Sequence, residues 1–290
     1  MVKKPAEGHM SNKILIIGAS GFIGQIFYKE LLSYFDVYGT YTHQQENFER
    51  NHVFFEFDCE NHSIETILRS VQPSFIISCF KGPIPAILKT HKILNEYCIA
   101  TNSKILYVSS AKVFDAKGKF PSYEKDTPLS ESEEGRKHIA VEKCIFDLPK
   151  TYYAILRLPM ILGVNAPLIL QLKQAIKHHA SFEVFPNLII SATTTKKLAQ
   201  QIHYIINKKL SGIFHLSSQD VTHHDDLFME ISSKLSNKTP IFKKVFSSNE
   251  DQFLAILPKE NKLPKNYKIS IEEVIAESTL MDEIMTLKKE

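Results

Sequence analysis

The feature that most constrains this chain is a run of three glycines, Gly18, Gly21 and Gly24, spaced three residues apart. They follow an apolar run at residues 13–17 and precede residues 22–34, whose apolar positions recur at helical spacing. The chain has only ten glycines in 290 residues, so three within seven positions indicate a backbone requirement. A glycine turn from a buried strand into a helix is typical of dinucleotide-binding proteins, although a tight turn without a ligand is the alternative.

Short apolar runs alternate with amphipathic segments through the first half of the chain. The expected strands are residues 13–17, 37–41, 53–57, 74–79, 104–108, 152–156 and 212–216. The expected helices are residues 22–34, 63–71, 133–146, 168–178, 196–206 and 224–235, with a further one carrying Ile87, His91, Leu94 and Cys98 on one face. This α/β alternation predicts a Rossmann-type, doubly wound parallel sheet.

The expected organisation has one boundary. Residues 11–160 are predicted to form an NAD(P)-binding domain, and residues 161–290 a smaller, partly interleaved C-terminal part. Residues 1–10 have no structural pattern and contain Gly8-His9-Met10, as in a cloning scar, so we expect a tag or a disordered segment. The polar stretch at residues 115–134 is expected to be a surface loop.

Composition excludes several function classes. A net charge of +3, from 35 basic and 32 acidic residues, is too small to indicate nucleic-acid binding. Because no apolar run approaches about 18 residues, no membrane span is expected. The four cysteines are widely spaced, so we expect free, buried thiols. The pair His223-His224 lacks a third ligand, so we expect two surface histidines at a helix start and no metal site. With no secretory signal, the expected location is the cytoplasm.

Several segments, taken in order, carry a family resemblance. They are Tyr107-Val-Ser-Ser-Ala-Lys-Val-Phe-Asp115, residues 120–128, residues 156–163, residues 212–217 and Leu263-Pro-Lys-Asn-Tyr267. Together they resemble dTDP-4-dehydrorhamnose reductases, within the extended short-chain dehydrogenase/reductase superfamily. The resemblance implies a nucleotide-sugar substrate bound by residues 161–290, an NAD(P)-dependent reductase or epimerase activity in surface polysaccharide synthesis, and either a homodimer or a partner enzyme.

The cofactor residues follow from the glycine turn and the resemblance together. We expect them to be Gly18, Ser20, Gly21, Phe22, Ile23, Gly24, His43, Asp58, Cys79 and Phe80. The second strand ends without the acidic residue that would bind the ribose of NAD, so NADP is favoured over NAD. In this arrangement His43 would donate to the extra phosphate and Asp58 would contact the adenine. The alternatives are that His43 is an exposed histidine and Asp58 caps a strand end.

The pair that performs proton transfer in the superfamily, Tyr-x-x-x-Lys on one helix face, is missing at the expected place. With Gly135 and Glu142 as anchors, Glu134 stands at the tyrosine position and His138 at the lysine position, unless the register slips by one and Lys137 fills that role. Ser110 occupies the position of the assisting hydroxyl. The expected catalytic residues are therefore Ser110, Glu134 and His138.

Glutamate cannot simply replace tyrosine, because its reference pKa of about 4.3 leaves it ionised at neutral pH. Histidine, with a reference pKa near 6.5, can act as acid or base, but Glu134 and His138 can equally form a surface pair without chemistry. Tyr123 is a nearby substitute, whereas Tyr204-x-x-x-Lys208 fits the pattern on an unrelated helix. Two functions remain: a reductase or epimerase with unorthodox catalysis, or an inactive NAD(P)-binding regulatory or partner subunit.

Overall fold

The computed structural model describes residues 12–42, 51–246 and 248–280. The expected tag at residues 1–10 and the expected cofactor residue His43 lie outside these ranges. Within them the chain forms two compact units. Unit 1 takes residues up to 108, 140–154 and 206–212, and unit 2 takes residues 109–139, 155–205 and from 213 onward. The chain therefore passes between the units repeatedly. The sequence suggested a boundary at residue 160 with a partly interleaved C-terminal part.

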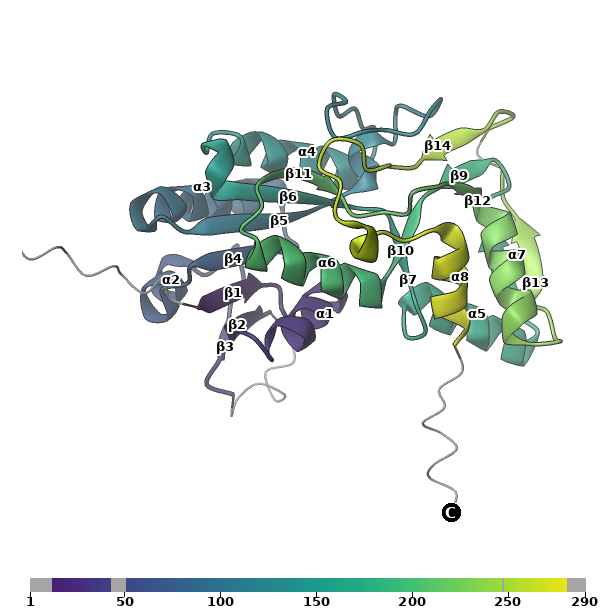
Figure 1. Ribbon diagram of the computed structural model, residues 1–290, viewed down its shortest axis with the longest axis horizontal. Coiled ribbons are helices and arrows are strands. Elements are labelled where there is room, and N and C mark those ends of the chain that lie inside the picture. Colours follow the sequence, from purple (N-terminus) through teal and green to yellow (C-terminus); the bar gives the residue numbers. More distant parts are fainter. Residues whose placement is uncertain (1–11, 43–50, 247, 281–290) are drawn as a thin grey trace, which may run out of the picture. The chain divides into compact units, whose positions relative to one another are not determined.

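A seven-stranded sheet of order β11-β6-β5-β4-β1-β2-β3 organises the fold (Figure 1). Its strands are β1 (Lys13–Ile17), β2 (Asp36–Tyr41), β3 (Phe54–Glu56), β4 (Phe75–Ser78), β5 (Lys104–Ser110), β6 (Tyr153–Leu158) and β11 (Gly212–His215). β1 pairs in parallel with β2 on one side and with β4 on the other, so the strand order reverses between β1 and β4. This confirms the doubly wound sheet and creates the switch point at which such sheets bind ligands.

The helices of the first half are α1 (Phe22–Leu31), α2 (Glu65–Val71), α3 (Ile84–Thr101) and α4 (Glu133–Ile145). The strands beside them are almost wholly buried: Ile14–Ile17 and Phe75–Ser78 are buried throughout. α2 and α3 end in left-handed residues, Gln72 and Asn102, which stop the helices sharply. α1 ends three residues before the predicted end, because the chain turns there to start β2.

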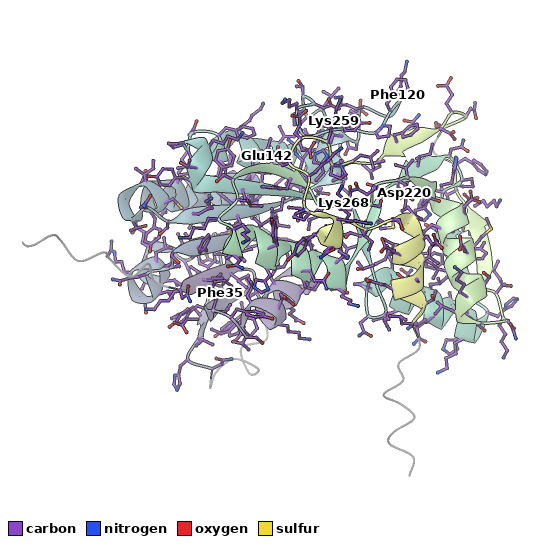
Figure 2. The ribbon with its side chains drawn as sticks, in the orientation of Figure 1. Phe35, Phe120, Glu142, Asp220, Lys259 and Lys268 are labelled. Carbon is purple, nitrogen blue, oxygen red and sulfur yellow. The ribbon has the colours of Figure 1, made fainter. Side chains whose placement is uncertain are left out.

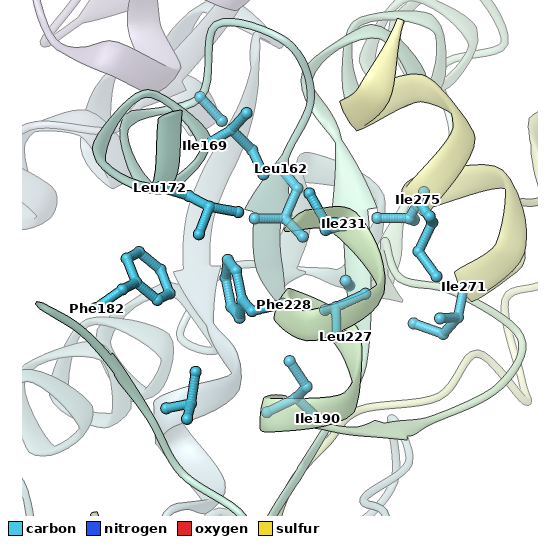
Figure 3. Packing of buried hydrophobic residues seen from close by; sticks show 14 of the residues in the cluster. Leu162, Ile169, Leu172, Phe182, Ile190, Leu227, Phe228, Ile231, Ile271 and Ile275 are labelled. Atoms are coloured by element: carbon cyan, nitrogen blue, oxygen red, sulfur yellow. The ribbon is translucent and has the colours of Figure 1, made fainter. Parts of the chain in front are cut away.

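The apolar core of unit 2 lies between α5 (Pro167–His178), α7 (His224–Leu235) and α8 (Ile271–Thr279). Figure 3 shows Phe182 and Phe228 within it, their ring centroids 5.0 Å apart. The remaining elements are α6 (Thr195–Asn207) and the short strands β7 (Met160–Leu162), β8 (Ser181–Val184), β9 (Leu188–Ile190), β10 (Ala192–Thr194), β12 (Thr222–His223), β13 (Ile241–Lys244) and β14 (Gln252–Leu254). None of these strands was predicted, because two to four residues carry too little periodicity to distinguish them from loops.

Across the three described ranges, no helix is both long and apolar enough to span a bilayer.

Candidate functional site

The glycine turn after β1 is closed so tightly that side chains are excluded from two of its positions. Gly18 has φ +90°, and a Cβ there would lie 2.8 Å from the carbonyl oxygen of Cys79 and 2.9 Å from Phe80 Cα. A Cβ on Gly24 would lie 2.2 Å from the carbonyl oxygen of Gly18, so α1 packs directly on the turn. Cys79 and Phe80, expected beside the cofactor, are thereby in contact with the turn.

Thr40, at the end of β2, holds the turn from the other side. Its Oγ1 accepts a hydrogen bond from Gly18 N–H at 2.9 Å, and its carbonyl oxygen accepts one from Ser20 N–H at 3.3 Å. The side chain is buried. Thr40 was not among the predicted cofactor residues, because a single threonine near the end of a mixed strand carries no signal of this contact.

The start of α1 provides free hydrogen-bond donors. Gly21 is the N-cap and supplies no side-chain cap, and the first helical hydrogen bond runs from Gln25 N–H to the Gly21 carbonyl oxygen at 2.9 Å. The N–H groups of Phe22, Ile23 and Gly24 therefore precede the helical ladder. No acidic residue lies in this first turn, and Phe22 is 38% exposed. An exposed, uncapped positive helix end fits the pyrophosphate of a dinucleotide.

Asp58 follows β3 and is engaged in its own turn. Its carboxylate accepts hydrogen bonds from Glu60 N–H at 3.0 Å and Asn61 Nδ2 at 2.6 Å, and its N–H donates to His62 Nδ1 at 3.1 Å. These contacts are those of a strand-end cap. The adenine contact expected of Asp58 stays a prediction.

The two residues after β4 differ in chemistry. The Cys79 thiol donates to the carbonyl oxygen of Ile17 at 3.3 Å, and burial raises the pKa of Cys79 to about 12, so it stays protonated. The ring of Phe80 stacks on that of His91, with centroids 5.5 Å apart, and packs edge-to-face with that of Phe57, with centroids 5.8 Å apart. Cys79 therefore packs rather than reacts, while Phe80 belongs to an aromatic cluster.

A second group of polar residues lies within unit 2, at the end of β5. Ser110 caps a short 3₁₀ turn, Ala111–Phe114, and its Oγ accepts the N–H of Lys112 at 3.2 Å. Lys112 Nζ lies 2.5 Å from Glu134 Oε2, and the two side chains are 44% and 54% exposed. Ser110 and Glu134 thus both contact Lys112, which was not among the residues predicted from the sequence. His138 lies one turn further along α4, partly buried.

Gly135 explains how α4 comes so close to this turn. A Cβ on Gly135 would lie 2.2 Å from the carbonyl oxygen of Lys112, so only glycine permits the approach. Ser132 Oγ accepts Gly135 N–H at 3.0 Å and itself donates to the Asp115 carboxylate, which also accepts Glu131 N–H at 2.8 Å. Burial acts to raise the pKa of Asp115, but these hydrogen bonds outweigh it and lower the pKa below the ordinary value. These contacts therefore hold the backbone around Glu134 in place.

The rings of the alternative proton donors named from the sequence contact neighbouring side chains. Tyr204 stacks on Tyr267 with ring centroids 4.4 Å apart. Tyr123 donates its N–H to Asp126 at 3.0 Å, and Lys259 Nζ lies 5.0 Å from the centroid of the Tyr123 ring. Lys259 is labelled in Figure 2.

One expectation in this part of the chain was wrong. His224 was expected at the surface beside His223, but it is buried, because its ring packs between Phe185 and Phe228 at 5.1 and 4.8 Å. His223 Nδ1 donates to the Pro186 carbonyl oxygen at 2.8 Å. No group of three His, Cys, Asp or Glu residues suited to a metal ion occurs in the described part of the chain.

The family model described as the RmlD substrate binding domain matches residues 88–277. The chain belongs to this family. The match runs from α3 to α8, and it supports the resemblance to dTDP-4-dehydrorhamnose reductases carried by the sequence motifs. No curated protein sequence matches the chain.

Solved structures of similar fold cover almost the whole chain. dTDP-4-dehydrorhamnose reductase from Yersinia enterocolitica is 18% identical with a TM-score of 0.72, over 92% of this chain and 98% of that one. The reductase from Bacillus anthracis, in complex with NADP, is 20% identical with a TM-score of 0.73, over 93% and 99%. dTDP-glucose 4,6-dehydratase from the same organism, in complex with NAD, is 15% identical with a TM-score of 0.75, over 96% and 97%. At these identities the likeness establishes the fold.

Proposed function

We propose that this protein binds NADP or NAD through residues 18–24 and acts on a nucleotide sugar in surface polysaccharide synthesis, without the Tyr-x-x-x-Lys pair. The observation that carries the proposal is the turn itself. Side chains are excluded at Gly18 and Gly24, Thr40 fixes the backbone, and the start of α1 is exposed and uncapped. Such a turn presents N–H donors to a pyrophosphate.

A bound nicotinamide dinucleotide supplies or takes up a hydride. The N–H groups of Phe22, Ile23 and Gly24 receive the pyrophosphate, with Ser20 beside them, and Asp58 and Phe80 contact the adenosine half. Because β2 ends at Tyr41 and is followed by Thr42, with no carboxylate at either position, the extra phosphate of NADP meets no repulsion there, which favours NADP over NAD. The structural neighbours from Bacillus anthracis bind NADP in one case and NAD in the other.

Phe22→Glu tests the cofactor site without threatening the fold. The side chain is 38% exposed, and an acidic residue in the first turn of a helix is favourable for stability. The new carboxylate would lie where the pyrophosphate binds, so NADPH affinity, measured by fluorescence titration, should fall at least about tenfold. Lys29→Ala, on an exposed residue in the last turn of α1, is the control. Equal NADPH affinity in Phe22→Glu and wild type, or no binding of either cofactor by wild type, would remove the proposal.

The second candidate is a catalytically inactive NAD(P)-binding regulatory or partner subunit. It is favoured by the ion pair that joins Glu134, at the tyrosine position, to Lys112. Turnover of a 4-keto nucleotide sugar separates the two candidates. Activity that disappears in His138→Ala or Glu134→Gln supports unorthodox catalysis, whereas binding of cofactor and nucleotide sugar with no turnover supports the inactive subunit. In that case size-exclusion chromatography with a copurified enzyme would identify a partner, and a homodimer is the other assembly we propose.

A further inference from the structure

Lys112 contacts two of the residues that the sequence predicted to be catalytic: Ser110, at the end of β5, and Glu134, in α4. Its backbone N–H donates to Ser110 Oγ at 3.2 Å, and its Nζ lies 2.5 Å from Glu134 Oε2. We propose that the Lys112 ammonium gives the proton to the carbonyl oxygen of the sugar during reduction, taking the part of the missing tyrosine, with the Ser110 hydroxyl as second donor to that oxygen. This inference rests on the proposed function, because it needs a nucleotide-sugar substrate and a reduced nicotinamide.

The position of Lys112 beside Glu134 is set by the backbone. The Lys112 carbonyl oxygen lies so close to Gly135 that any Cβ there would be 2.2 Å away. The first turn of α4 therefore packs directly on the 3₁₀ turn, and this places the Cα atoms of Glu134 and Lys112 within reach of an ion pair. Ion pairs between two mobile surface side chains are weak, partly because both must be immobilised. Here the close approach of the two backbones reduces that cost.

The pair also retains hydrogen-bonding capacity for a ligand. An ammonium has three N–H donors, and Glu134 accepts one of them within the described contacts. Ser110 Oγ accepts the N–H of Lys112, which leaves its hydroxyl hydrogen to donate. Lys112 is 44% exposed, so a ligand can reach it. Two donors on one short, fixed turn can stabilise a developing alkoxide in the manner of an oxyanion hole.

The proton chemistry is balanced and of suitable strength. The sugar carbonyl carbon accepts a hydride from the reduced nicotinamide, and the π electron pair of the C=O bond moves to oxygen. That oxygen takes a proton from Lys112 Nζ, whose N–H electron pair stays on nitrogen, and the exposed amine regains a proton from water. An ammonium, like a phenol, carries a proton that a developing alkoxide, a much stronger base, can take. Glu134, as a carboxylate, balances the added positive charge.

Binding tests the contact without requiring turnover. Calorimetry with NADP present compares dTDP-glucose with dTDP, which lacks the sugar, on wild type, Lys112→Met and Lys117→Met. Lys117 is a suitable control, because it is a neighbouring lysine whose Nζ lies 3.6 Å from Asp126 and does not contact Glu134 in the described ion pairs. Loss of a charge-assisted hydrogen bond predicts about tenfold weaker dTDP-glucose binding in Lys112→Met, unchanged dTDP binding, and wild-type behaviour in Lys117→Met.

Unchanged dTDP-glucose binding in Lys112→Met, or equal losses for both ligands, would overturn the inference while leaving the proposed function in place. A wild-type protein that binds neither cofactor nor nucleotide sugar would instead refute the proposed function.

Lys112→Arg separates proton transfer from charge. A guanidinium keeps the positive charge and the donors but does not release its proton. We expect dTDP-glucose affinity within a few-fold of wild type, whereas reduction of a dTDP-4-keto-6-deoxyhexose by NADPH should fall at least about 100-fold. Full turnover by Lys112→Arg, or no turnover by wild type, would overturn the role of Lys112 as proton donor.

Discussion

Three buried histidines should make this protein lose stability between neutral and mildly acidic pH. Burial lowers the pKa of His91 to about 4. Burial and, to a smaller extent, the positive charge of Arg157 lower the pKa of His215 to about 3. Burial also lowers the pKa of His224 to about 4. Each is therefore neutral in the folded protein, whereas in the unfolded chain each titrates near 6.5.

The hydrogen bonds of these side chains agree with the neutral form. His91 Nδ1 donates to the Ile87 carbonyl oxygen at 2.8 Å, so its Nε2 is left to accept from Ser78 Oγ–H at 2.9 Å. His215 Nδ1 donates to the Leu257 carbonyl oxygen at 3.1 Å, and its Nε2 faces the Arg157 guanidinium at 3.4 Å. A proton on either Nε2 would lose an acceptor and, at His215, would add a charge beside a cation.

The sign and size of the effect follow from proton linkage. Each folded-state pKa is lowered, so below pH 6.5 the unfolded chain binds more protons and stability falls as the pH falls. From about pH 7.5 to about pH 5.5 each histidine costs about 1.4 kcal/mol, and the three together about 4 kcal/mol. That is a large part of the 5–15 kcal/mol by which most proteins are stable. If the units unfold separately, unit 1, with His91, loses about one third and unit 2 about two thirds.

Urea unfolding at a series of pH values measures the effect. The chain has no tryptophan, so far-UV circular dichroism is the appropriate probe. His215→Gln should reduce the pH-dependent loss by about a third, whatever it does to stability at neutral pH. The control is His52→Gln, because His52 is exposed and its side chain is hydrated in both states. A change below about 1 kcal/mol in wild type, or the same pH dependence in His215→Gln, would refute the reasoning.

Three further outcomes test individual contacts. Thr40→Val removes the acceptor of Gly18 N–H and should destabilise unit 1 by about 1–3 kcal/mol in urea unfolding and weaken NADPH binding; unchanged affinity would show that Thr40 does not fix the turn. Glu124→Ala removes the buried carboxylate that accepts the N–H groups of Lys259 and Glu260. The free energy of unfolding should therefore fall by about 3 kcal/mol or more, and an unaltered urea midpoint would contradict this. Cys98 is buried and its pKa is raised to about 12, so it should react with Ellman's reagent only on unfolding; fast reaction in the native protein would be inconsistent.

Regular elements with strong local signals were predictable from the sequence. β1 and α7 occupy the predicted residues, 13–17 and 224–235. β1 is a continuous apolar run, and α7 has acidic residues in its first turn and a lysine in its last. The glycine turn was predictable for the same reason, since its strand, its spacing and its helix are adjacent in sequence.

The second polar group was only half predictable. Ser110 and Glu134 were found by position, but their meeting point, Lys112, was not, because the ion pair joins residues 22 apart along the chain. A loop without periodicity gives no indication of which of its charged residues will meet. The burial of His224 was missed for a similar reason. A polar residue at a helix start is usually exposed, and it is Phe185, 39 residues earlier, that together with Phe228 buries this one.

The environment of Gly135 is relevant to whether the residues around it have lost catalysis or perform it differently. A Cβ at position 135 would clash with the Lys112 carbonyl oxygen, so packing alone requires glycine there. The presence of Gly135 beside Glu134 is therefore no evidence for or against catalysis. Lys112, a cation two residues after Ser110, pairs with the anion at the tyrosine position. The two residues therefore compensate each other in charge, which fits an inactive subunit as well as a proton donor on the turn after β5, and it is the Lys112→Arg assay that separates the two.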